Sequence, residues 1–357
     1  MKILHTADLH LDSPFEALPS AKAAERRKEQ RQLLSRIADV ANSENVDLVL
    51  LCGDLLDSDS SYYETGEELI RSLRRISAPV FVAPGNHDYY SEKSPYAKLE
   101  LPDNVHVFSK KSVEYAEYRE KGFRVFGCAF TDKFDADHLS GFSYKPTDSL
   151  LNIMCIHGEP KPDEIAGSGM NYVALGHIHK ATGLLNAGGV YYSQPGCPEG
   201  RGFDETGEKY INLVTLDYNS CSLEQIAVYS RKYEILKVDV SGRDPLLAVK
   251  MALADDTVRD IYRIVLTGES DYTIDTELIR KNLNEYFYEL QVVDSTKLKS
   301  DIWEKCSEDT LRGLFLSKLK AQFDEASTDE DKAMIEKAVR WGLAAVDNAE
   351  EVKIHGN

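Results

Sequence analysis

The sequence has few features of a secreted or membrane protein. No apolar run in its 357 residues approaches the roughly 20 residues of a membrane span. No N-terminal stretch has the charged, apolar and small-residue sections of a signal peptide. The six cysteines form no C-x-x-C pair, so we expect free thiols and not disulfides. These absences predict a cytoplasmic protein without a membrane segment.

Basic residues are also scarce. The chain has 42 Lys and Arg against 60 Asp and Glu, which gives a formal net charge of −18. Tight binding to DNA without sequence preference normally comes from clustered Lys and Arg. The composition therefore argues against a strong autonomous DNA-binding surface, although it leaves room for a local basic strip. The length suffices for one large domain and one or two small modules.

The order of apolar segments predicts an α/β protein with three parts. Strands and helices alternate from residue 1 to about 129, which is typical of βαβ units. Between residues 150 and 230 the expected strands lie closer together, which predicts antiparallel neighbours that close a second sheet against the first. A small strand and helix module follows, and then a helical segment. We place the domains at residues 1–230, 231–298 and 299–357.

Five short segments with metal-ligand side chains end or follow expected strands. They are Asp8-Leu9-His10, Gly53-Asp54, Gly85-Asn86-His87-Asp88, His157-Gly158 and Gly176-His177-Ile178-His179. Apolar runs precede nearly all of them, as in buried parallel strands, and open sheets bind ligands beyond the carboxyl ends of such strands. Imidazole nitrogens with carboxylate and amide oxygens suit Mn, Fe or Zn better than Ca or a thiolate cluster.

These segments predict a two-metal phosphoesterase centre. The ligands that we expect for the first ion are Asp8, His10, Asp54 and His179. Those for the second are Asp54, Asn86, His157 and His177. Asp54 would bridge the two ions, and a bridging water made acidic by both would attack phosphorus in line. Taken singly, Asp8 or Asn86 is more often a turn residue and His157 a core histidine, but so many ligand types at strand ends argue against coincidence.

His87 is not needed as a ligand, which predicts another role. It would donate a hydrogen bond to the phosphoryl oxygens or a proton to the leaving alkoxide. Asp57 is our first candidate for the group that holds its ring, and Asp88 is the second. Three basic residues that follow the ligand loops are candidates for contacts with substrate phosphates, although each alone is more typical of a solvated surface: Lys161, Lys180 and Arg201.

The order Asp-x-His, Gly-Asp-x-x-Asp, Gly-Asn-His-Asp, His-Gly, Gly-His-x-His resembles the calcineurin-like metallophosphoesterase superfamily over about residues 1–230. The opening residues 2–11, Gln194-Pro195-Gly196 and Arg201-Gly202-Phe203-Asp204-Glu205 are more narrowly similar to DNA repair exonucleases of the SbcD type. The resemblance implies a four-layer αββα sandwich, a small capping domain and Mn-dependent exonuclease and endonuclease activity. It also implies a homodimer and a partner ATPase with a long coiled coil, similar to SbcC.

Three functions remain open at this point. The first is a two-metal phosphodiesterase that acts on DNA, as a repair nuclease subunit. The second is a phosphodiesterase or phosphatase for a small molecule or nucleotide. The third is a scaffold subunit of an ATPase complex with a vestigial metal site. The sequence argues against this third function, because no ligand position is missing. Apolar residues at helical spacing after residue 300 predict a partner surface or two helices packed on each other.

Overall fold

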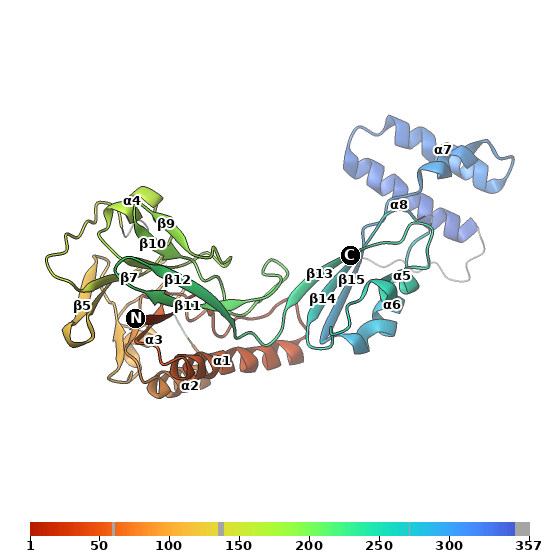
Figure 1. The fold of residues 1–357 in the computed structure, drawn as a ribbon. Helices are drawn as coiled ribbons and strands as arrows, with labels where there is room; N and C mark the ends of the chain where they lie inside the picture. The colour runs from red at the N-terminus through yellow and green to blue at the C-terminus, as the bar shows by residue number, and fades with distance from the viewer. Residues whose placement is uncertain (59–60, 135–138, 271, 347–357) are drawn as a thin grey trace. The chain divides into compact units, whose positions relative to one another are not determined.

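The computed structural model describes residues 1–58, 61–134, 139–270 and 272–346 (Figure 1). The chain forms two compact units, Met1–Tyr233 and Glu234–Asn357. Residues 347–357 of the expected helical segment lie outside the described residues. Within the described ranges, no helix is long and apolar enough to cross a membrane. All six cysteines are free thiols, as predicted.

The first sheet of the N-terminal unit has the strand order β12-β11-β1-β2-β3-β4. Its strands are β1 (Lys2–Thr6), β2 (Leu48–Leu51), β3 (Val80–Val82), β4 (Val105–Val107), β11 (Tyr210–Leu216) and β12 (Cys221–Ala227). Strands β1 to β4 are parallel, whereas β11 pairs antiparallel with both β1 and β12. The carboxyl ends of β1, β2 and β3 therefore meet at one edge of this sheet.

The second sheet has the order β5-β6-β7-β8-β10-β9. Its strands are β5 (Glu114–Tyr118), β6 (Phe123–Gly127), β7 (Leu151–His157), β8 (Tyr172–Gly176), β9 (Leu185–Ala187) and β10 (Val190–Ser193). Strands β6, β7, β8 and β10 are parallel to one another, and β5 and β9 add to the edges antiparallel. The carboxyl ends of β7 and β8 lie side by side because these two strands are parallel neighbours.

The two sheets pack face to face with helices outside, so the αββα layers are confirmed (Figure 1). Helices α1 (Ser20–Ser43) and α2 (Tyr63–Arg75) cover the first sheet, where Leu33, Leu34 and Ile37 of α1 contribute to a buried core. A second core lies between the sheets, and a third lies under α4 (Pro162–Gly167). Short helices α3 (Pro95–Lys98) and η1 (Arg119–Lys121) complete this unit.

The prediction of antiparallel neighbours between residues 150 and 230 holds for β11 and β12 but was wrong for β7, β8 and β10, which are parallel. The segment between β7 and β8 contains α4, which serves as a crossover and makes these strands parallel. Strand β9 pairs antiparallel with β10, and β10 in turn pairs parallel with β8. Strands β11 and β12 then return to the first sheet beside β1. Close spacing along the chain therefore does not identify the sheet to which a strand belongs.

The chain after the sandwich forms a small α/β module followed by helices. The three-stranded sheet has the order β13-β14-β15 and packs with two helices around its own apolar core. Its elements are β13 (Tyr233–Asp239), α5 (Pro245–Ala252), β14 (Ile261–Thr267), α6 (Thr276–Leu283), η2 (Asn284–Tyr286) and β15 (Glu289–Asp294). The remaining elements are η3 (Ser300–Ser307), α7 (Leu311–Glu325) and α8 (Asp329–Val346). A separate apolar cluster, which includes Leu316 and Val339, holds α7 and α8 together.

Candidate metal centre

The predicted ligand residues all lie at the carboxyl ends of five strands. Asp8 and His10 follow β1, Asp54 follows β2, and Asn86 follows β3. In the second sheet, His157 ends β7, and His177 and His179 follow β8. Because the sheets pack against each other, these loops converge at one edge of the sandwich. Asp8, His10, Asp54 and His157 are almost fully buried.

The backbone at this edge has an unusual conformation. Asp8, His10, Asp54 and His177 have φ angles of 55°, 43°, 50° and 93°. A positive φ is uncommon for residues other than glycine, and such residues gather at functional sites where the surrounding structure holds them. These turns lie directly after the strands and carry side chains of both donor groups described below.

Two glycines of the sequence segments leave room for the ligand side chains. A Cβ atom on Gly85 would lie 2.2 Å from Asp54 Oδ1, and one on Gly176 would lie 1.9 Å from the carbonyl oxygen of Cys52. Any other residue at these positions would displace the loops that carry Asp54 and His157. The glycines of Gly-Asn-His-Asp and Gly-His-x-His therefore have a steric explanation.

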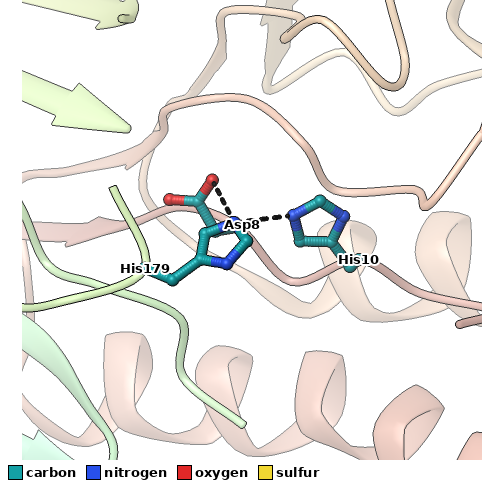
Figure 2. A group of neighbouring side chains, drawn as sticks. All are labelled: Asp8, His10 and His179. Carbon is teal, nitrogen blue, oxygen red and sulfur yellow. Dashed lines mark hydrogen bonds and ion pairs between the residues drawn. The ribbon is translucent and has the colours of Figure 1, made fainter. Parts of the chain in front are cut away.

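The first group of donor atoms comprises Asp8, His10 and His179 (Figure 2). His10 Nε2 lies 3.2 Å from His179 Nε2, and His179 Nε2 lies 3.8 Å from Asp8 Oδ1. Asp54 is next to this group, with its Oδ2 atom 3.6 Å from His10 Nε2. The four side chains assigned to the first ion therefore converge.

The second group surrounds the other side of Asp54. His157 Nε2 lies 3.3 Å from Asp54 Oδ2, 3.1 Å from Asn86 Oδ1 and 3.3 Å from His177 Nδ1. The Asp54 carboxylate thus stands between the two groups, as a bridging ligand must. His177 is at the rim, with 42% of its side chain exposed.

Hydrogen bonds behind the rings indicate which nitrogen of each histidine faces the site. The Nδ1 atoms of His10 and His157 lie 3.1 and 2.8 Å from Asp57 Oδ1 and the carbonyl oxygen of Cys52. These oxygens only accept, so each of these two Nδ1 atoms carries the proton and each Nε2 turns a lone pair into the site. His179 Nδ1 has two outer neighbours, Glu205 Oε1 at 2.7 Å and Arg201 Nη2 at 3.1 Å. The lone pairs of His10 and His157 lie 3.6 and 3.3 Å from the Asp54 carboxylate, and such groups repel unless a cation lies among them. The residues therefore fit divalent metal ions.

The pKa values of the buried groups point the same way. Burial raises the pKa of Asp8 to about 7 and lowers that of His10 to about 4. Burial alone would also lower the pKa of His157, but the Asp54 carboxylate raises it to about 9.

His87 contacts its predicted partner, Asp57, through the main chain and not through the carboxylate. His87 Nδ1 lies 3.0 Å from the main-chain carbonyl oxygen of Asp57, whereas the Asp57 carboxylate contacts His10, Ser13 and Arg201. The Asp57 side chain turns toward His10 because Arg201 and Ser13 lie on that side. The His87 ring is nevertheless close to the site, with its centroid 4.8 Å from that of His10.

Asp88, the second candidate for that partner, also has a different role. Its carboxylate is buried and accepts hydrogen bonds from the main-chain N–H groups of Asp54, Leu55, Leu56 and Gly85 and from the hydroxyl group of Tyr96. Burial raises the pKa of Asp88, and the charge of Asp54 adds to this effect. The residue ties the loop after β2 to the loop after β3, and so positions Asp54.

The three basic candidates for phosphate contacts lie in different environments. Lys161 is exposed at the N-terminus of α4. Lys180 is exposed and lines a cavity of about 700 Å³, which His177 and His179 also line. Arg201 is not a solvated surface cation, because its guanidinium group is paired with Glu205 and Asp57. Of the three, Lys180 is thus the cation with a cavity beside the site.

Sequence reasoning did not assign Glu205 a role in the site. This residue is 5% exposed and contacts both His179 and Arg201. Its spacing of four residues from Arg201 was a signal for an ion pair within the 201–205 loop. Nothing in the sequence indicated that this pair would lie behind a metal-site histidine.

Comparisons with known proteins agree with this geometry. The model of the calcineurin-like phosphoesterase family matches residues 1–181, just over half of the chain. The chain therefore belongs to this family. It is a metal-dependent phosphoesterase, since the family hydrolyses phosphoester bonds at a dimetal centre.

Three curated relatives extend the similarity beyond residue 181. The uncharacterized metallophosphoesterase YhaO of Bacillus subtilis is 28% identical over 320 residues, which cover 82% of this chain and 77% of the relative. The DNA double-strand break repair protein Mre11 of Saccharolobus solfataricus is 24% identical over 298 residues, 75% of this chain and 76% of the relative. The SbcCD nuclease subunit from Bacillus subtilis is 27% identical over 266 residues, 60% and 66% respectively.

Proposed function

We propose that this chain is a two-metal nuclease that cleaves phosphodiester bonds in DNA and serves as a DNA repair subunit. The observation that carries the proposal is the convergence of two donor groups around Asp54, with His87 beside them. The similarity to relatives named as a DNA break repair protein and a nuclease subunit supports DNA as the substrate. The ligand set that we propose is Asp8, His10, Asp54, Asn86, His157, His177 and His179.

Two divalent ions, Mn in our proposal, would supply an activated water nucleophile and neutralise the charge on the phosphate oxygens. The chain's own contribution to proton transfer is His87. Its Nδ1 donates to the carbonyl oxygen of Asp57, and its main-chain N–H donates to Asp54 Oδ1 at 3.0 Å. These bonds fix the ring, so that the protonated form of His87 holds its second proton on Nε2. This proton is available to the alkoxide that leaves phosphorus.

The cavity beside His177 and His179 is our proposed position for a nucleotide next to the scissile bond. Lys180 and Lys209 line it and can meet a phosphate. Three acidic residues line it as well, namely Asp204, Glu205 and Glu208. This charge balance, together with the net charge of −18, favours a second candidate function. That candidate is a phosphodiesterase or phosphatase for a small molecule or nucleotide.

One set of assays distinguishes the two functions. The purified chain, loaded with Mn²⁺, is tested on single-stranded DNA, on a bis-aryl phosphate and on an aryl phosphate monoester. We expect hydrolysis of the DNA and of the diester, and loss of both activities in EDTA. If the chain hydrolyses the monoester or the bis-aryl diester but leaves the DNA uncleaved, the result would favour the second candidate. The absence of any metal-dependent hydrolysis would overturn both.

We further propose that helices α7 and α8 dock a coiled-coil ATPase similar to SbcC. Leu311 and Leu314 of α7 and Met334 of α8 expose 58–70% of their surfaces, so these apolar side chains are open to a partner. The double substitution Leu311→Asp and Leu314→Asp should abolish co-purification with such an ATPase and leave metal-dependent hydrolysis intact. Undiminished co-purification would exclude this surface. We also propose a homodimer, which light scattering of the purified chain tests.

A further inference from the structure

The two histidines of the first donor group are each backed by a carboxylate. His10 Nδ1 lies 3.1 Å from Asp57 Oδ1, and His179 Nδ1 lies 2.7 Å from Glu205 Oε1. A carboxylate behind a histidine fixes the ring and increases the basicity of the nitrogen that faces the metal. Both rings of this group therefore have a carboxylate as an outer neighbour, and His179 Nδ1 also lies 3.1 Å from Arg201 Nη2.

Arg201 joins these two carboxylates. Its Nη1 donates to Asp57 Oδ1 at 3.2 Å, and its Nη2 donates to Glu205 Oε1 at 2.6 Å. The main-chain N–H of Arg201 also donates to Glu205 Oε2 at 2.8 Å. Since His10 and His179 approach each other on the inner side, the five residues form a closed ring of contacts. Arg201 is four-fifths buried, so water screens these charge-assisted bonds little.

The second donor group has no comparable support in the described part of the chain. His157 Nδ1 donates to the neutral carbonyl oxygen of Cys52. The outer nitrogen of His177 lies 3.8 Å from Glu159, whose side chain is 60% exposed. A contact of this length in solvent fixes a ring weakly. The remaining ligand, Asn86, is a neutral amide.

We propose that Arg201 and Glu205 are positioning residues that make the cation position at His10 and His179 the tighter of the two. This inference rests on the proposed metal centre and adds to it an order of filling. The first ion occupies the position between His10 and His179, which Asp57, Arg201 and Glu205 support from behind. The second ion occupies the position at His157 and His177 and exchanges more readily. Arg201 acts through Glu205 and Asp57 and through its own contact with His179.

The test is a Mn²⁺ titration of the metal-free full chain by calorimetry. We expect two binding events in the wild type, a tight one and a weak one. Glu205→Gln keeps the size of the side chain but removes its charge, and should weaken the tight event about 10- to 100-fold. The matched control is Glu159→Gln, which makes the same chemical change behind His177 and should alter the weak event less than about threefold.

Electron paramagnetic resonance adds a readout that a general loss of structure would not produce. With one equivalent of Mn²⁺, the wild type should show the spectrum of an isolated ion. Glu205→Gln should show a fraction of spin-coupled pairs at the same loading, because the affinities of the two positions are then closer and some chains hold both ions. An unchanged tight event in Glu205→Gln, with two ions still bound, would overturn the inference alone. A wild-type chain that binds no Mn²⁺ would overturn the metal centre itself.

Discussion

The buried carboxylate of Asp88 offers a quantitative test of how the site is held together. It accepts four main-chain N–H groups, two on each oxygen, and the hydroxyl group of Tyr96. An asparagine at position 88 has one carbonyl oxygen and an NH₂ group. Whichever way its amide is turned, the NH₂ group faces two N–H donors that then lack an acceptor. Each such donor costs about 1–3 kcal/mol, so Asp88→Asn should lower the free energy of unfolding by about 2–6 kcal/mol.

Urea denaturation followed by far-UV circular dichroism measures this loss. The control is Asp103→Asn, since Asp103 is exposed and its substitution should change stability by no more than about 0.5 kcal/mol. Tyr96→Phe removes one bond to the same carboxylate and should cost about 1.5–3 kcal/mol, which keeps the test open if Asp88→Asn does not fold. A loss for Asp88→Asn as small as that of the exposed control would refute the reasoning.

Three further predictions follow from the site. His87→Gln should retain its Mn content, measured by mass spectrometry, but hydrolyse a phosphodiester about 10²- to 10⁴-fold more slowly; equal turnover would reject the role of His87 in proton transfer. Gly85→Ala should weaken Mn²⁺ binding and cost about 1–3 kcal/mol, because its Cβ meets Asp54, whereas Gly167→Ala, whose Cβ meets nothing within 4 Å, should do neither. EDTA should abolish hydrolysis, and Mn²⁺ should restore it; activity that persists in EDTA would contradict a metal-dependent reaction.

The sequence allowed the buried strands to be predicted because their composition is distinctive. Strands β2, β3 and β8 are continuous apolar runs, and β7 is apolar apart from Asn152 and His157, as expected for strands covered on both faces. Strand β5, with the sequence Glu-Tyr-Ala-Glu-Tyr, lacks this signal because it is a half-exposed edge strand, and it was not predicted. The return of β11 and β12 to the first sheet was also missed, because it depends on packing and not on local pattern.

The convergence of the donor residues was predictable for a related reason. Parallel strands bring their carboxyl ends to one edge, so the position of a residue after its strand is enough to place it there. The partners behind the rings were not predictable, because they depend on the direction in which each side chain points. Asp57 contacts His87 through its main-chain carbonyl oxygen, whereas its carboxylate contacts His10. Arg201 was a candidate for phosphate contact but pairs with Glu205.

The positive φ angles at Asp8, His10, Asp54 and His177 restrict how this architecture can change over evolution. Asn, Asp, His and Gly adopt such angles far more readily than β-branched residues do. A descendant that lost hydrolysis could discard donor atoms, yet would still need permissive residues at these four turns to keep its loops in shape. Asn or Gly at these four positions would therefore indicate a relative that has lost hydrolysis but kept the loop conformations. Val or Ile would indicate that the loops have a different conformation.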